Sequence, residues 1–134
     1  NAAAGTREIS ETVARINELL MSVHGVKFVV FHDAYQYFER RFGISVSGSI
    51  LAGDALAPNP ARLIEIRGQV AEMGIGCVFS EPQFNPGLVA SVLQDAGVNT
   101  AVIDPQGIEL ELSMGLYPQM LERIAKEIAA CGEE

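Results

Sequence analysis

The chain has 134 residues, of which 49% are hydrophobic, and 17 acidic against 9 basic side chains give it a formal net charge of −8. This length suits a single domain that buries roughly two-thirds of its unfolded surface. Nucleic acids and anionic membrane surfaces are held by clustered Lys and Arg, so the acidic balance argues against both and favours a cation as partner. No apolar run approaches the roughly 20 residues of a membrane span, so no membrane insertion is expected.

The first third of the chain predicts two helices and two strands. From Thr6 to about Val23, apolar residues recur at steps of three and four, the period of a helix with one buried face. A buried strand is expected over 27–31. Asp33 and Gln36 have the form of a capping box for a helix that ends at a glycine, and alternation over 44–51 predicts a second strand.

The rest of the chain repeats this alternation, and its helix starts are the clearest signals. An asparagine followed by proline is typical of a helix cap and first helical position, and it occurs twice. The expected elements are a helix from Asn59-Pro60 closed by Gly74 and Gly76, a strand over 77–80, a helix from Asn85-Pro86 to about Ala96, a strand over 99–103, a long connection over 104–117, and a final helix ending near Cys131-Gly132.

Alternating strands and helices imply right-handed βαβ crossovers. The predicted fold is therefore a three-layer α/β/α sandwich with a mostly parallel four-stranded sheet. In such a sheet all carboxyl ends lie on one edge, where open α/β folds bind their ligands. His32, Glu81 and Asp104 each follow a predicted strand and are expected on this edge, and Asp54 is a fourth candidate.

His32 is the main candidate ligand, because imidazole suits borderline metals such as zinc. The alternative is a structural imidazole bonded to a neighbouring carbonyl. Asp33 is interpreted as a helix cap, while Glu81 and Asp104 each precede a proline and can equally be loop carboxylates. His24 stands beside a glycine at a helix end, where an imidazole complements carbonyl groups, and it is not expected to be a ligand.

Several other residues are interpreted as structural. Four aromatic residues, Tyr35, Tyr37, Phe38 and Phe42, are expected to pack in the core around a helix. Cys77 and Cys131 are 54 positions apart and form no metal-binding CxxC motif; a disulfide and two buried thiols are both compatible with this spacing. Cys77 is expected at the start of its strand, far from His32, which argues against a Cys–His catalytic pair. No nucleotide-binding glycine motif is present.

Five segments carry a resemblance to a known family. They are Phe28-Val-Val-Phe-His-Asp-Ala-Tyr-Gln-Tyr-Phe-Glu39, Phe42-Gly43-Ile44, Leu63-Ile-Glu-Ile-Arg67, Cys77-Val-Phe-Ser-Glu-Pro-Gln-Phe84 and Ile103-Asp-Pro-Gln-Gly107. In this order they resemble the C-terminal lobe of the zinc-specific solute-binding proteins of bacterial ABC importers, the ZnuA type. In that family two α/β lobes are joined by one long helix, and the metal lies between the lobes.

The resemblance implies specific roles. His32 corresponds to the histidine ligand of the second lobe, and Asp104 to an aspartate that binds the metal in manganese-type relatives and is a candidate in zinc-type ones. Manganese-type relatives carry a carboxylate where His32 stands, so the resemblance favours Zn²⁺. It also implies a Cys77–Cys131 disulfide, and hence a location in the periplasm. The implied partners are zinc and an ABC permease, and the implied protein is not an enzyme.

The same resemblance divides the chain into residues 1–24, the tail of the interlobe helix with a possible cloning scar at 1–2, and residues 25–134, the metal-binding lobe. A first lobe with its histidines is missing, and one histidine with a carboxylate cannot complete the roughly four ligands of zinc. The site is therefore expected to be partial. Two alternatives are a freestanding metal-relay or interaction domain that shares His32 across a dimer, and a small flavodoxin-like enzyme using His32 and Asp104.

Overall fold

The computed structural model describes residues 1–51 and 59–133. Its described part holds a four-stranded, all-parallel sheet in the order β2-β1-β3-β4. The strands are β1 (Lys27–Val30), β2 (Val46–Ser49), β3 (Ile75–Ser80) and β4 (Asn99–Val102), and the helices are α1 (Ala2–Leu20), the short 3-10 helix η1 (Met21–Val23), α2 (Gln36–Phe42), α3 (Pro60–Met73), α4 (Pro86–Leu93) and α5 (Leu116–Glu133).

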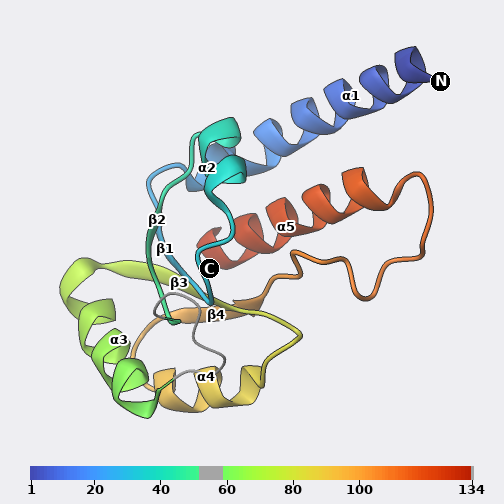
Figure 1. The fold of residues 1–134 in the computed structure, drawn as a ribbon. Helices are drawn as coiled ribbons and strands as arrows, with labels where there is room; N and C mark the ends of the chain where they lie inside the picture. The colour runs from blue at the N-terminus through green and yellow to red at the C-terminus, as the bar shows by residue number, and fades with distance from the viewer. Residues whose placement is uncertain (52–58, 134) are drawn as a thin grey trace.

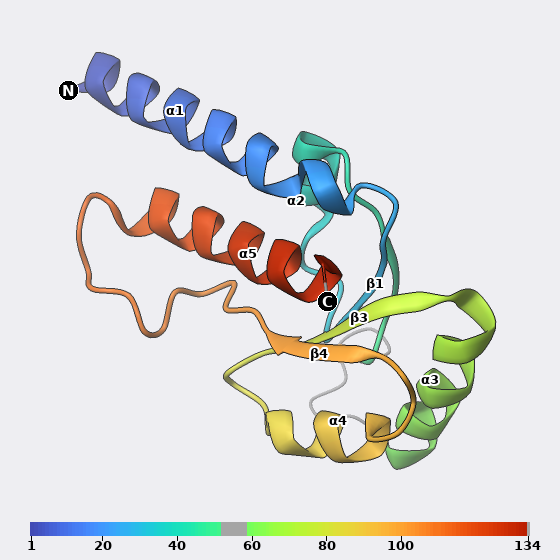
Figure 2. The same ribbon diagram turned by 180° about the vertical axis from the view of Figure 1, so that it is seen from behind.

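Helices cover both faces of the sheet, which confirms the predicted α/β sandwich (Figure 1). Helices α1, α2 and α5 lie on one side, and α3 and α4 lie on the other. Figure 2 shows that α1 and α5 run side by side and that the first turns of α1 extend beyond the start of α5. All of residues 1–11 are exposed there.

Alternation along β1 explains why the sheet needs two covering layers. Phe28 and Val30 belong to the core under α1 and α5, whereas Val29 and Phe31 belong to the core over α3 and α4. Each of these four side chains is at most 4% exposed. A strand that is apolar on both faces is typical of a parallel sheet buried between helices.

Some predicted boundaries are wrong, and the causes are local. Asp33 does not cap a helix: α2 begins at Gln36, Tyr35 occupies the cap position, and the Asp33 carboxylate accepts a hydrogen bond from the Gln36 side-chain amide at 2.9 Å. Gly76 does not close a helix either, because Gly74 alone does so with a φ of 65°. Gly76 lies inside β3 where the pairing with β1 shifts register, and an added Cβ would come within 2.7 Å of the Val26 side chain.

The remaining differences are shifts at the ends of elements. The first helix begins at Ala2 rather than Thr6, β2 is shorter than 44–51, and α4 ends at Leu93 rather than near Ala96. Two strands end one residue earlier than expected: those predicted over 27–31 and 99–103. The asparagine–proline starts of α3 and α4 are confirmed, since Asn59 and Asn85 each accept a backbone N–H at the helix start.

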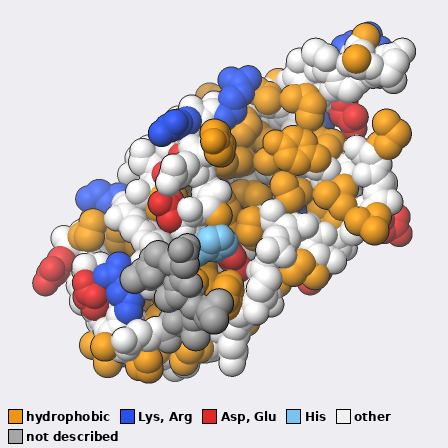
Figure 3. All heavy atoms as spheres, viewed as in Figure 1, with side chains coloured by type: hydrophobic (Ala, Val, Ile, Leu, Met, Phe, Trp, Pro, Cys, Tyr) orange, Lys and Arg blue, Asp and Glu red, His pale blue; other side chains and the backbone are white. Residues whose placement is uncertain are grey.

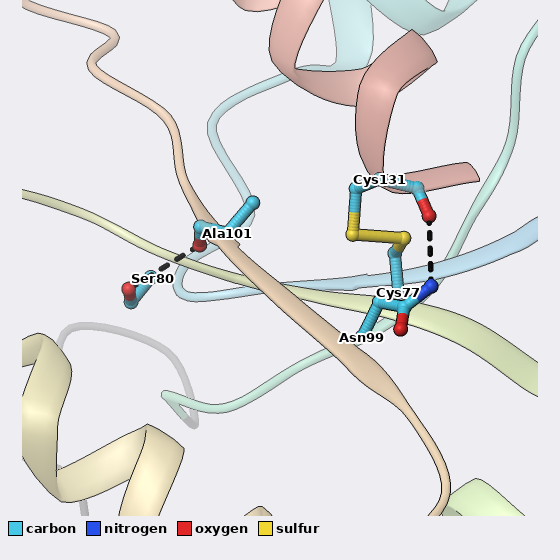
Figure 4. The surroundings of a disulfide bond; sticks show 5 residues. All are labelled: Cys77, Ser80, Asn99, Ala101 and Cys131. Carbon is cyan, nitrogen blue, oxygen red and sulfur yellow. Dashed lines mark hydrogen bonds between the residues drawn. A yellow bond between two sulfur atoms is a disulfide. The ribbon is translucent and has the colours of Figure 1, made fainter. Parts of the chain in front are cut away.

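A disulfide joins Cys77 in β3 to Cys131 near the end of α5 (Figure 4). Cys77 is the third residue of β3 rather than its first. The Asn99 side chain donates a hydrogen bond to the Cys131 carbonyl at 3.2 Å, so β4 is held to the same helix end. The bridge and this hydrogen bond together hold the end of α5 to β3 and β4.

Removal of this bridge is expected to destabilise the domain. The two cysteines are 54 positions apart, and closing a loop of that size lowers the entropy of the unfolded chain by an amount worth about 4 kcal/mol at most. Urea unfolding should show most of that loss for the Cys77→Ala/Cys131→Ala double variant. The reduced wild-type chain is the control for lost packing, and equal stability of the oxidised and reduced forms would contradict a role in folding.

Candidate metal-binding site

The candidate site lies where the direction of the sheet's connections reverses. From β1 the chain crosses to β2 at one edge, and from β3 it crosses to β4 at the other, while β1 and β3 are neighbours in the middle. In open α/β sheets this switch point opens a crevice at the carboxyl ends of the strands. His32 follows β1 by two residues, and Glu81 directly follows β3, so both flank the switch point.

His32 and Glu81 are in contact there. The His32 Nδ1 atom lies 2.7 Å from Oε1 of Glu81, although the ring is not turned to the best alignment for a hydrogen bond. The His32 side chain is 39% exposed, whereas the Glu81 side chain is only 1% exposed. Nδ1 itself is buried, so the exposed part of the ring is the part that faces away from Glu81.

Tyr35 completes this group from the start of α2. Its hydroxyl donates a hydrogen bond of 2.8 Å to the same Oε1 atom of Glu81. Burial raises the pKa of Tyr35 well above its ordinary value, and the neighbouring Glu81 carboxylate raises it further, so the hydroxyl keeps its proton. Tyr35 is thus a permanent donor to Glu81.

Glu81 is a buried carboxylate held by these neighbours. Burial raises the pKa of Glu81 above its ordinary value, while the Tyr35 hydrogen bond and the His32 contact act in the opposite direction. A buried carboxylate is costly unless it is paired and hydrogen-bonded. Two groups meet that need at Oε1, and Oε2 has no partner among the residues that the structure describes.

Asp104 lies on the same edge, after β4, but it faces its own loop. Its carboxylate accepts backbone N–H groups from Gln106, Gly107 and Ile108 at 3.0, 2.9 and 2.6 Å. Its negative charge makes a minor contribution to raising the pKa of both Tyr35 and Glu81. Within residues 1–51 and 59–133, no hydrogen bond or ion pair joins Asp104 to His32, and no group of three potential metal ligands is assembled.

The structure gives mixed outcomes for the other residues considered in the sequence. His24 meets the Gly43 carbonyl through Nδ1 at 3.0 Å, as expected for an imidazole at a helix end. Asp54 lies outside the described residues. Phe38 and Phe42 are buried as predicted, but Tyr37 is 88% exposed, so its assignment to the core is wrong. The polar role of Tyr35 was missed, although a buried tyrosine hydroxyl usually has a partner and could have signalled one.

An apolar hollow of about 440 Å³ borders the site. It lies between α1, α2 and α5, where hydrophobic side chains gather on the surface in Figure 3. Tyr35 and Pro105 line it on the side of the site, and Ile9, Tyr37 and Tyr117 line it elsewhere. These three side chains are 38%, 88% and 56% exposed, so this face carries large apolar groups in contact with solvent.

The fold of the chain matches about half the length of two solved structures. The structure matches the manganese-bound solute-binding protein FpvC of Pseudomonas aeruginosa with a TM-score of 0.82 and 21% identity, covering 99% of this chain and 50% of that one. It matches a crystal structure of ZnuA with a TM-score of 0.76 and 22% identity, covering 97% and 48%. These likenesses establish the fold.

The chain belongs to the ZnuA family, described as zinc-uptake complex component A, periplasmic, whose profile matches residues 1–131. It is 40% identical over 131 residues to the high-affinity zinc uptake system protein ZnuA of Brucella abortus and 34% identical over 131 residues to the ZnuA protein of Haemophilus ducreyi. Each match covers 98% of this chain but only 39% and 42% of the relative. The chain thus spans about two-fifths of the length of these relatives.

Substitution of Asp104 tests its structural role. Asp104→Ala removes the acceptor for three backbone N–H groups, and we expect a loss of about 2 kcal/mol in the free energy of unfolding. Asp33→Ala is the matched control, since that exposed carboxylate accepts one side-chain hydrogen bond and its loss should cost less than about 0.5 kcal/mol. Urea unfolding measures both, and equal effects would refute the assignment.

Proposed function

We propose that this chain is the C-terminal, zinc-binding lobe of a periplasmic protein that captures Zn²⁺ and delivers it to an ABC permease, and that it catalyses no reaction. The observation that carries the proposal is the half-exposed imidazole of His32 at the switch point of the sheet, backed by a buried carboxylate. Metal-binding histidines commonly have a carboxylate or carbonyl behind the ring nitrogen that does not bind the metal.

The chemistry of the edge favours zinc over harder cations. Imidazole is a borderline ligand that suits zinc, whereas Mg²⁺, Ca²⁺ and Mn²⁺ favour sites built from oxygen atoms. Asp104 is proposed as a second, candidate ligand. Its two oxygens offer about four lone-pair directions and the backbone occupies three, so one remains for a cation. The relatives' names, which refer to zinc uptake, agree with this choice.

The proposed site is partial. Zinc takes about four ligands, and His32 with Asp104 supplies two at most. We propose that the other ligands come from an N-terminal lobe, for which residues 1–24 are the end of the connecting helix and residues 25–134 the metal-binding lobe. The apolar hollow beside Tyr35 and the exposed first turns of α1 support this proposal, because both present surface that a neighbouring lobe would cover.

A periplasmic location is supported by the disulfide and by the family description. Disulfides persist in oxidising compartments such as the bacterial periplasm and are rare in the cytosol. None of the described helices is both long and apolar enough to cross a membrane. The acidic net charge of −8 is compatible with a protein that handles cations, and it argues against nucleic acid as a partner.

Zinc titration tests the proposed function. Calorimetry on the 134-residue chain should show no binding tighter than about micromolar, because two ligands leave the coordination shell of zinc to water. In the natural gene product that contains this chain, chelator competition should show far tighter binding. His32→Ala should weaken that binding by at least about 100-fold. Loss of a residue that only supports a ligand typically costs up to about 100-fold, so loss of a ligand itself should cost at least as much.

His24→Ala is the matched control, since it removes the second imidazole of the chain from a position at a helix end. Its zinc affinity should equal that of the wild type. Unchanged affinity of the His32→Ala variant would overturn the proposal. Tight one-to-one binding by the monomeric 134-residue chain would refute the partial site.

A further inference from the structure

Glu81 is an unusual residue to bury at the end of a strand. Its side chain is 1% exposed, and it follows Phe79 and Ser80, which are also buried. An apolar residue of the same size would avoid the cost of removing a carboxylate from water, and replacement of buried ionic groups by apolar ones is often neutral or stabilising. Packing alone therefore does not explain a glutamate at this position.

The contacts of Glu81 converge on one oxygen and define where the protons lie. Oε1 accepts the Tyr35 hydroxyl proton at 2.8 Å and lies 2.7 Å from Nδ1 of His32. A nitrogen lone pair would be repelled by a carboxylate oxygen at that distance. With Glu81 as an ionised carboxylate, Oε1 can only accept, so the proton in the second contact belongs to Nδ1, although the ring is not turned into the best alignment for that hydrogen bond in this structure.

The burial of Nδ1 determines which ring nitrogen of His32 a metal ion can reach. Nδ1 is shielded from solvent although the side chain as a whole is 39% exposed. A cation that arrives from solvent can therefore reach the ring only at Nε2. With the proton on Nδ1, Nε2 carries the free lone pair that a metal needs, since the tautomer of a histidine is set by the hydrogen bond of its other nitrogen.

We propose that Glu81 is a positioning residue for metal capture: it holds His32 in the tautomer and orientation that present Nε2 to the ion, and Tyr35 holds Glu81. This deepens the proposed function and rests on it for the identity of the ion. The proposal assigns no metal contact to Glu81 or Tyr35, because both side chains are buried behind the ring.

Two measurements on four variants test this role. Nitrogen-15 NMR of the imidazoles in the metal-free 134-residue chain reports the His32 tautomer, with His24 as a reference in the same spectrum. Chelator competition in the natural gene product reports zinc affinity. The variants are Glu81→Leu, Glu81→Gln, Tyr35→Phe and, as matched control, Glu39→Gln, whose carboxylate is half-buried and accepts the Val46 N–H.

We expect the wild type and Glu39→Gln to show a protonated Nδ1 and equal zinc affinity. Glu81→Leu should lose the tautomer preference and about 10- to 100-fold in affinity, as for other outer-shell partners of metal-binding histidines. Glu81→Gln keeps an acceptor oxygen in place of Oε1, so it should keep the tautomer and lose less affinity. Tyr35→Phe should fall between Glu81→Gln and Glu81→Leu in affinity.

The outcomes separate this proposal from the proposed function. If Glu81→Leu keeps both the tautomer and the affinity while His32→Ala loses zinc, the positioning role is wrong and the function stands. If the wild-type ring carries its proton on Nε2, the positioning role is also overturned. If Glu81→Leu does not fold, the comparison of Glu81→Gln and Tyr35→Phe with Glu39→Gln decides, and no difference among the three would overturn the proposal.

Discussion

The contact between the Glu81 carboxylate and the His32 ring is the interaction on which the proposed metal binding depends. A parallel sheet places the ends of β1 and β3 next to each other, and the chain uses this proximity to set a buried charge behind a half-exposed imidazole. The charge is retained at a cost in desolvation, which Tyr35 reduces by donating its hydroxyl. Without Glu81 and Tyr35, no neighbouring side chain in the described part of the chain would orient the His32 ring at the carboxyl end of β1.

The arrangement of the sheet explains why residues from distant parts of the sequence meet here. Glu81 lies 46 positions after Tyr35, yet the hydrogen bond between them is direct. Asp104 comes from a third strand end and influences the same group through its charge while its oxygens hold the following turn. If His32 and Asp104 bind the ion as proposed, they do so from a preformed edge, so little ordering is required on binding.

The sequence predicted the fold well because its signals were local and mutually consistent. The asparagine–proline pairs located two helix starts, and the apolar run of β1 indicated a strand buried on both faces, as Phe28 and Val29 confirm by packing on opposite sides. Errors arose where tertiary contacts overrode local preference. Asp33 has the composition of a cap, but Tyr35 must turn inward to reach Glu81, and the helix begins after that turn.

The site was predictable in position and only partly in its contacts. The order of strands and helices predicted that His32, Glu81 and Asp104 lie on one edge. The contact of His32 with Glu81 depends on β1 and β3 being neighbours in the sheet. No single segment of the sequence specifies that strand order. The sequence correctly predicted that Tyr35 is buried, but it did not predict the hydrogen bond of its hydroxyl to Glu81. The prediction for Tyr37 was wrong because Tyr35 and Tyr37 flank the first residue of a short helix, where no repeating pattern distinguishes the buried tyrosine from the exposed one.

The disulfide and the candidate metal site lie at different positions along β3, the bridge at Cys77 in its first half and the site just beyond its carboxyl end. Cys77 and Glu81 are four residues apart in an extended strand, a separation of about 13 Å, and effects of sites more than about 10 Å apart usually add independently. The domain thereby places its covalent cross-link and its candidate metal site at separate positions along one strand. A change at the bridge should therefore alter the stability of the domain while leaving the geometry around His32 intact.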